Sequence, residues 1–148
     1  MTEIQRGKVL AVNISEKKGT RKTNVRLCAV MKDFGLKDDA HGGPWHRQVS
    51  LLANESIEKM KAMGLNVGYG DFAENITTQG VDLVHLPIGT TIRISDSVTL
   101  RVTQIGKVCH ERCAIYYQAG DCVMPKEGIF TEVANEGEIN VGDEIVIE

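Results

Sequence analysis

Apolar and polar residues alternate over several short stretches of the chain, which is the pattern of half-buried β-strands. Residues 98–102 are the clearest case, because Val98, Leu100 and Val102 share one face and the residues between them share the other. Residues 91–94 precede them, and three polar residues separate the two stretches. We therefore predict a β-hairpin here.

Other short stretches have the same character. Residues 23–30 also alternate, with Val25, Leu27 and Ala29 on one face. A turn at residues 140–143 precedes the last predicted strand. The remaining predicted strands are residues 7–14, 49–52, 128–133 and 144–147. Short strands at this spacing predict a mainly β protein, built as a closed or nearly closed and mainly antiparallel β-barrel.

A helix near residues 56–63 interrupts the strand pattern. Asn54 or Ser56 is positioned to cap its start, and Gly64 stands at the usual C′ position. The apolar side chains expected to face the core are Ile57, Met60 and Met63. A second, shorter helix is predicted over residues 109–117, where helical geometry puts Cys109 and Cys113 on one face.

Two polar loops rich in glycine are candidates for ligand binding. Residues 38–48 lead directly into the predicted strand 49–52, and residues 68–78 form the second loop. Neither matches a P-loop or a dinucleotide fingerprint, because the spacing differs and no long helix follows. Their amide, hydroxyl, imidazole and guanidinium donors suit a phosphate or another oxyanion.

Length and charge narrow the classes of protein. A chain of 148 residues is expected to form a single domain, residues 1–148, with a core of its own. The net charge of −3 gives no support to nucleic-acid binding. No apolar run approaches the roughly 20 residues of a membrane span, and the polar start shows no secretory signal. We therefore expect a cytoplasmic protein whose four cysteines are reduced thiols.

Three of the four cysteines lie between residues 106 and 122, which makes this segment the strongest candidate for chemistry. Lys107, His110 and Arg112 surround Cys109 with positive charge. Positive charge lowers the pKa of a thiol and favours the nucleophilic, metal-binding thiolate. Cys109 is therefore the candidate reactive cysteine.

Zinc is a competing interpretation of the same segment. Cys109, Cys113 and Cys122, together with His110 or His41, could form a tetrahedral set. The usual C-x2-C spacing is absent, which argues against both a zinc knuckle and a thioredoxin-type couple. Cys113 and Cys122 have equal claims to structural and functional roles, whereas Cys28 lies in an alternating strand and is read as a small buried hydrophobe.

A set of motifs distributed over nearly the whole chain carries a family resemblance. The motifs are Asp39-Ala40-His41-Gly42, His46-Arg47-Gln48-Val49-Ser50-Leu51-Leu52, Gly70-Asp71-Phe72-Ala73-Glu74-Asn75-Ile76-Thr77-Thr78, Leu86-Pro87-Ile88-Gly89-Thr90, Thr103-Gln104-Ile105-Gly106-Lys107, Cys109-His110, Cys113-Ala114-Ile115, Gly120-Asp121-Cys122-Val123-Met124-Pro125 and Gly137-Glu138-Ile139-Asn140-Val141-Gly142-Asp143. Together they resemble a stand-alone MOSC domain, named for the C-terminal domain of molybdenum-cofactor sulfurases. Asp38 stands where the family usually has glycine.

The resemblance implies a MOSC-type β-barrel with a few short helices and a role in molybdenum-cofactor chemistry. The family's functional cysteine, thought to carry sulfur as a persulfide or to ligate molybdenum, falls on Cys109. The residues expected to bind the cofactor (molybdopterin) are Asp39, His41, Arg47, Asn75, Thr77, Lys107, His110 and Arg112. We expect Cys109 and the two polar loops to converge on one pocket at a barrel rim.

The implied partners are molybdopterin-processing enzymes or a separate cysteine desulfurase. Pyridoxal phosphate is expected only on that partner, because 148 residues leave no room for a desulfurase fold. A homodimer is compatible with the sequence. Whether the protein is an enzyme of sulfur transfer stays open, and the alternative is a non-catalytic module that binds molybdate or pterin oxyanions or regulates a partner.

Several candidate residues also have purely structural interpretations. His41 and His46 could tie their loop by hydrogen bonds as readily as contact a ligand. Arg47 could form an ion pair at a barrel rim, although a guanidinium also suits an anionic pterin phosphate. Asn75 and Thr77 could simply hold a turn.

Overall fold

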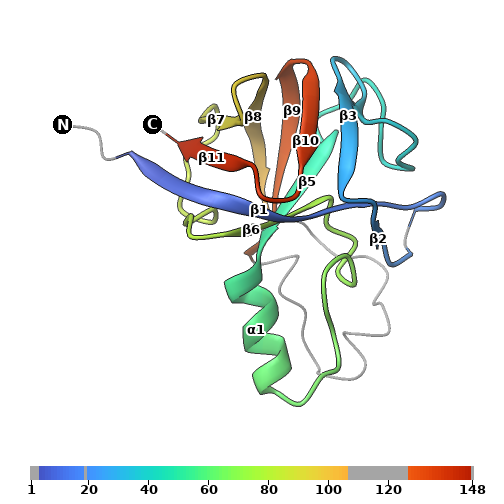
Figure 1. The fold of residues 1–148 in the computed structure, drawn as a ribbon, viewed down its shortest axis with the longest axis vertical. Coiled ribbons are helices and arrows are strands. Elements are labelled where there is room, and N and C mark those ends of the chain that lie inside the picture. The colour runs from blue at the N-terminus through green and yellow to red at the C-terminus, as the bar shows by residue number, and fades with distance from the viewer. Residues whose placement is uncertain (1–3, 19, 107–126, 148) are drawn as a thin grey trace.

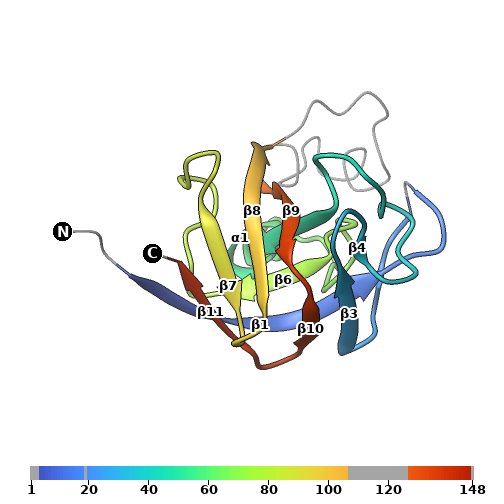
Figure 2. The same ribbon diagram turned by 90° about the horizontal axis from the view of Figure 1, so that it is seen from above.

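The computed structural model describes residues 4–18, 20–106 and 127–147 of the chain. Seven strands within these residues close into a mixed barrel (Figure 2). In order around the barrel the strands are β1 (Gln5–Ile14), β6 (Ile76–Gln79), β5 (Val49–Ala53), β9 (Ile129–Asn135), β8 (Val98–Ile105), β7 (Thr91–Ile94) and β11 (Glu144–Ile147). Pairing of β11 with β1, which sets Gln5 opposite Ile147, closes the ring.

One pair of neighbouring strands requires a crossover connection. Strands β5 and β6 run parallel, whereas the other neighbouring strands of the barrel run antiparallel. A parallel pair cannot be joined by a tight turn and needs a crossover connection. Here the crossover begins with α1 (Asn54–Ala62), which projects from one end of the barrel (Figure 1).

Three short strands form a second sheet against the barrel. Its order is β10 (Gly137–Asn140), β3 (Leu27–Met31) and β4 (Gly35–Leu36). The two-residue strand β2 (Thr23–Asn24) pairs with the far end of β1. The long β1 therefore passes from the barrel into the polar region described below.

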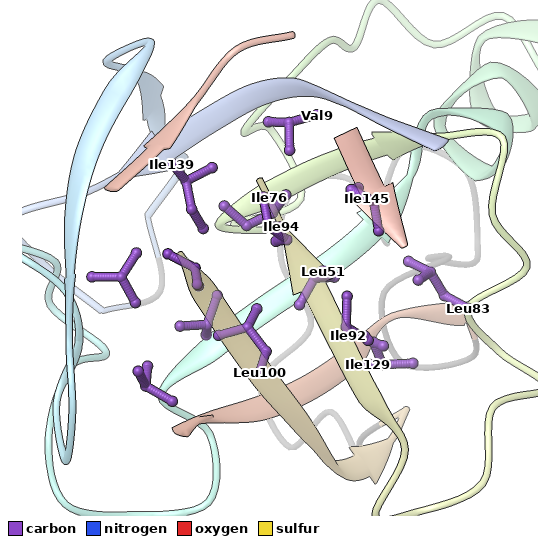
Figure 3. Packing of buried hydrophobic residues seen from close by; sticks show 14 of the residues in the cluster. Val9, Leu51, Ile76, Leu83, Ile92, Ile94, Leu100, Ile129, Ile139 and Ile145 are labelled. Atoms are coloured by element: carbon purple, nitrogen blue, oxygen red, sulfur yellow. The ribbon is translucent and has the colours of Figure 1, made fainter. Parts of the chain in front are cut away.

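The barrel interior is filled by aliphatic side chains from every barrel strand (Figure 3). Branched residues suit the inward face of a pleated sheet, which explains their dominance here. A smaller cluster lies between α1 and the barrel, formed by Leu52, Ile57, Met60, Val67, Phe72 and Phe130. The members of the main core that Figure 3 labels are Val9, Leu51, Ile76, Leu83, Ile92, Ile94, Leu100, Ile129, Ile139 and Ile145.

The structure confirms the β-barrel and the elements with the clearest pattern. The hairpin is β7–β8, and Val98, Leu100 and Val102 are all buried. The last strand occupies residues 144–147 as predicted, and Gly142 turns the chain before it with φ +94°.

The prediction of a single strand over residues 23–30 is wrong. The chain forms β2 and β3 instead, and Arg26 interrupts them with a left-handed φ of 67°. Val25 and Leu27 are exposed, whereas Cys28 and Val30 face the core. The alternation showed that side chains in this segment point to two faces, but it did not indicate which face packs against the core.

The second polar loop also contains a strand. Residues 76–79 form β6, the parallel neighbour of β5, although residues 68–78 were expected to be a loop. Thr77 and Thr78 are fully buried, so the polar residues that suggested a loop lie inside the fold. Strand β10 was also not predicted from the sequence.

The helix α1 lies where it was predicted, but its details differ. Its N-cap residue is Ala53, which makes no capping bond, so the prediction of Asn54 or Ser56 as the cap is wrong. The Ser56 hydroxyl instead donates to Glu127 Oε1 at 2.8 Å. Met63 was expected in the core but is 59% exposed. The expected second helix over residues 109–117 lies outside the described residues.

Candidate functional site

A buried ion pair is the centre of the polar region next to the barrel. Lys22 Nζ lies 2.7 Å from Asp39 Oδ1, and both side chains are fully inaccessible to solvent. The Lys22 ammonium also donates to Ser15 Oγ at 3.0 Å and contacts His41 Nδ1 at 2.9 Å. Burying two charges is costly unless their remaining donors and acceptors are paired. Here the Lys22 ammonium has polar atoms of Ser15, Asp39 and His41 within hydrogen-bond distance.

The Asp39 carboxyl group receives four hydrogen bonds. Besides Lys22, its donors are the backbone amide of Ser15 at 3.1 Å, the backbone amide of His41 at 3.3 Å and Asn75 Nδ2 at 3.0 Å. Asp38, just before it, adopts φ 67°, the left-handed conformation that the family's usual glycine favours. The turn after β4 thereby aims Asp39 inward.

Asn75 joins this ion pair to the barrel. Its amide nitrogen also donates to the Asn13 carbonyl at 3.1 Å, and its carbonyl oxygen accepts from the Ser50 amide at 2.9 Å and hydroxyl at 3.2 Å. Asn75 is fully buried. The loop before β6 is therefore attached to β1 and β5 through one side chain.

A buried carboxyl group, Glu74, holds the same loop from inside. It accepts from the backbone amides of Gly70 and Phe72 and from the Thr77 hydroxyl, at 3.1, 3.3 and 2.7 Å. Asn13 Nδ2 in turn donates to Thr77 Oγ1 at 3.1 Å. Burial raises the pKa of Glu74, and the hydrogen bonds that it accepts oppose this effect without cancelling it. We call Asn13, Ser15, Lys22, Asp39, His41, Glu74, Asn75 and Thr77 the buried polar cluster.

A second group of side chains lies where the first polar loop meets β8 and β9, and we call it the rim cluster: Trp45, His46, Arg47, Gln104 and Phe130. The Arg47 guanidinium carbon lies 5.1 Å from the Phe130 ring centre and 6.0 Å from that of Trp45. Lys18 Nζ lies 5.1 Å from the Trp45 ring centre. Cations held against aromatic faces create an electropositive surface with limited side-chain freedom. Such a surface suits an anion.

Gln104 connects the rim cluster to the segment that carries three cysteines. Its Oε1 accepts from Arg47 Nε at 3.2 Å and lies 3.0 Å from His46 Nε2. Its Nε2 donates to the carbonyl of Gly106 at 2.7 Å. The Gly106 amide donates to the Gly128 carbonyl at 2.7 Å, so the chain positions on either side of residues 107–126 are joined.

The structure relates some of the predicted site residues to one another. Asp39, His41, Asn75 and Thr77 belong to the buried polar cluster, and Arg47 belongs to the rim cluster. The two clusters meet at Trp45, whose indole Nε1 donates to the His41 carbonyl at 2.8 Å. Predicted residues outside the described part of the chain are Lys107, Cys109, His110 and Arg112, along with Cys113 and Cys122 of the zinc alternative. Convergence of both clusters with Cys109 stays a prediction.

Three residues that organise these clusters, Lys22, Glu74 and Gln104, were not predicted from the sequence. Lys22 sits in a run of basic and polar residues that resembles a solvated surface, and no local signal marks it as buried. Glu74 and Gln104 lie inside motifs of the family resemblance but were given no role. Contacts with other segments reveal Lys22 and Gln104, whereas Glu74 is revealed by its burial and by the hydrogen bonds that it accepts within its own loop.

Cys28 has the structural role expected of it. Its side chain is buried, and its thiol donates to the carbonyls of Ala29 and Lys37 at 3.4 and 3.5 Å. Burial raises the pKa of the Cys28 thiol. Within residues 4–18, 20–106 and 127–147, no three His, Cys, Asp or Glu side chains are grouped closely enough to hold a metal ion.

Comparison with known proteins identifies the family. The MOSC domain model matches residues 37–146, so the chain belongs to the MOSC domain family. The fold is similar to the crystal structure of the YuaD protein from Bacillus subtilis, with a TM-score of 0.81 at 18% identity over 99% of this chain and 98% of that one.

Two larger proteins share the fold. YiiM from Geobacillus stearothermophilus superposes with a TM-score of 0.69 at 19% identity, over 96% of this chain and 75% of that one. YiiM from Escherichia coli gives 0.67 at 16% identity, over 97% and 69%. No curated protein matches the sequence. In the described part of the chain, no helix has the length and apolar character needed to cross a membrane.

Proposed function

We propose that this MOSC protein serves molybdenum-cofactor chemistry, either by binding the cofactor or by carrying sulfur as a persulfide on Cys109 for cofactor sulfuration. Membership of the MOSC family supports the general role. The observation that carries the proposal for this chain is the link through Gln104. It joins Arg47 of the rim cluster to Gly106, and Cys109 follows Gly106 by three residues in the sequence.

The rim cluster has the chemistry to hold the anionic end of a pterin cofactor. Arg47 and Lys18 supply positive charge against Trp45, and His46 is an exposed imidazole beside them. Guanidinium groups bind phosphate oxygens through paired donors. In this proposal Lys107, His110 and Arg112 keep Cys109 as a thiolate.

The buried members of the predicted site have a supporting part in this proposal. Asp39, Asn75 and Thr77 are buried and hydrogen-bonded to neighbouring protein groups. We propose that they fix the shape of the two polar loops, while Arg47 and His41 are the described residues that contact the ligand.

Sulfur loading needs no external oxidant in this scheme. The Cys109 thiolate attacks the terminal sulfur of a persulfide on a separate cysteine desulfurase, which carries the pyridoxal phosphate. The donor's S–S bond breaks, its cysteine leaves as a thiolate, and a new S–S bond forms on Cys109. Oxidation states balance because one persulfide replaces another. The charge of the attacking thiolate passes to the departing one.

Substitution of Cys109 separates this function from its alternative, and substitution of Cys28 is the control. Loading with a cysteine desulfurase and free cysteine, followed by release of the sulfur with a thiol reductant, measures the persulfide. We expect Cys109→Ser to abolish loading and Cys28→Ser to leave it intact. Loading that survives Cys109→Ser would overturn the persulfide proposal.

The alternative, a non-catalytic oxyanion-binding or regulatory module, rests on Arg47 of the rim cluster and on Lys18 beside it, which act without a thiol. Equilibrium dialysis with molybdate tests it. Under this alternative, Arg47→Ala weakens molybdate binding by about tenfold or more, as expected for the loss of a charge-assisted contact. Cys109→Ser leaves it unchanged. Arg101→Ala, which removes an exposed arginine paired with Glu132, is the matched control.

A further inference from the structure

Basic residues are concentrated in one short stretch of the chain. Residues 17–26 hold five basic residues and no acidic one, although the whole chain has 17 basic and 20 acidic residues. Lys22 is buried against Asp39 and belongs to the buried polar cluster. The other four residues are exposed, and we call them the basic surface: Lys17, Lys18, Arg21 and Arg26.

The charge of the basic surface is balanced very little within the fold. Arg21 Nη1 lies 3.8 Å from Asp71 Oδ1, a distant pair whose arginine is 53% accessible. Among residues 4–18, 20–106 and 127–147, no acidic side chain forms an ion pair with Lys17, Lys18 or Arg26. Like charges this close in the sequence repel one another, so they do not stabilise the fold. Their arrangement therefore suits a partner of opposite charge outside the chain.

The loop between β1 and β2, which carries most of the basic surface, is fixed by its backbone. It extends past the barrel on the side away from both chain ends (Figure 1). The Ser15 and Thr20 hydroxyls donate to the Lys17 carbonyl at 3.0 and 2.8 Å, and the Lys22 amide donates to the Gly70 carbonyl at 2.8 Å. None of these bonds involves a side chain of the basic surface, so those side chains can be substituted without losing them.

The basic surface adjoins the rim cluster. Lys18 Nζ lies 5.1 Å from the Trp45 ring centre, and the Arg47 guanidinium carbon lies 6.0 Å from the same centre. A molecule docked on the basic surface is therefore beside the residues proposed above to hold the cofactor. A protein that delivers sulfur to this site has to dock within reach of it.

We propose that the basic surface is the docking site of the persulfide donor, a protein that presents an acidic patch. This partner assignment rests on the function proposed above. A small oxyanion needs few of these cations, whereas cations spread along an exposed loop match the charged patch of a protein and accelerate its encounter. A nucleic acid is disfavoured, because all 20 acidic residues lie outside this stretch and repel an extended polyanion. Docking changes how fast the two proteins meet and leaves the sulfur exchange itself unchanged.

Binding kinetics test the docking without any sulfur transfer. Surface plasmon resonance measures association of a cysteine desulfurase with the Cys109→Ser protein, which cannot be loaded in this scheme. We expect Lys17→Glu/Arg21→Glu to lower the association rate constant by about tenfold or more at about 20 mM salt. At about 0.5 M salt, most of the difference should disappear because the charges are screened. Lys8→Glu/Lys61→Glu, which reverses two exposed lysines on β1 and α1, is the matched control and should keep the rate of the Cys109→Ser parent.

The outcomes separate this docking site from the proposed function. An association rate constant unchanged by Lys17→Glu/Arg21→Glu, or lowered equally by the control, would overturn the docking site. Binding of a single-stranded RNA more tightly than the desulfurase would overturn the assignment of a protein partner. Sulfur loading of Cys109 is measured separately on the wild-type protein, so loading can fail while docking stands, and docking can fail while loading stands.

Discussion

Lys22 and Asp39 are 17 residues apart in the sequence, yet Lys22 Nζ and Asp39 Oδ1 lie 2.7 Å apart with both side chains fully buried. The pair ties the segment before β2 to the turn after β4. Asn75 extends the tie to β1 and β5. The loops of the candidate site are thus fixed by charge inside the fold.

Loss of one partner of this ion pair should destabilise the protein strongly. We expect Lys22→Met or Asp39→Asn to lower the free energy of unfolding by about 3–5 kcal/mol, because each leaves a buried group without its counterion or donor. The double variant should lose less than the sum of the two. Urea denaturation measures all three changes.

The control for these three variants is the exposed pair Arg6–Glu144, whose side chains are 61% and 59% accessible. Arg6→Met should change stability by at most about 1 kcal/mol. Additive effects at Lys22 and Asp39, each as small as the change at Arg6, would contradict the buried ion pair.

Gly70 is placed where only glycine fits. Its φ is +84°, and an added Cβ would lie 2.1 Å from the carbonyl oxygen of Lys22. We expect Gly70→Ala to cost about 3 kcal/mol or more, because the backbone must shift against the buried polar cluster. Gly64 has a similar φ of +95°, but no atom lies within 4 Å of an added Cβ. Gly64→Ala should therefore cost only about 1–2 kcal/mol. Thermal denaturation of the two variants compares them, and equal losses would contradict the close approach.

The buried carboxyl group of Glu74 should make stability depend on pH. Burial raises its pKa above the ordinary value of 4.5, so the folded protein binds this proton more tightly than the unfolded chain. Stability from this group is fully present below about pH 4.5 and is lost as pH rises through the raised pKa of the folded state. Glu74→Gln should flatten that decline in urea unfolding over about pH 4 to 8. The exposed Glu138→Gln is the control, and an equal decline in both variants would refute the assignment.

The cysteines should differ in reactivity. Because burial raises the pKa of Cys28 and hides its thiol, iodoacetamide should alkylate Cys28 slowly at neutral pH. Cys109, with basic neighbours in the sequence, should react first among the four cysteines. Site-resolved mass spectrometry over a pH series measures both rates. Faster alkylation of Cys28 or Cys122 would remove the physical basis of an activated Cys109.

The parts of the fold that could be predicted were those specified by local sequence. Val98, Leu100 and Val102 alternate with polar residues beside a polar turn, and β7–β8 formed as expected. Strand β6 was missed because Thr77 and Thr78 resemble loop residues. The buried Thr77 hydroxyl is paired with Glu74 of the same loop and with Asn13 of β1, and the contact with Asn13 exists only in the fold. Helix α1 was predicted by its apolar spacing, but its start was not.

The residues of the candidate site also include some that the sequence indicates and some that only the fold reveals. Asp39, His41, Arg47 and Asn75 were selected from the family resemblance together with the donor and acceptor groups of the two polar loops, and both are visible in the sequence. The roles of Lys22 and Gln104 come from contacts between segments that only the fold brings together. A lysine among basic residues carries no local sign that it is buried.

The most direct test of the central claim is intact-protein and peptide mass spectrometry of protein purified without reductant after exposure to a cysteine desulfurase and cysteine. We predict an adduct of one sulfur atom, located on Cys109 and removed by a thiol reductant. Cys109→Ser should lack it, and Cys28→Ser should keep it. Absence of the adduct from Cys109 in the wild-type protein, or its location on another cysteine, would contradict the persulfide account.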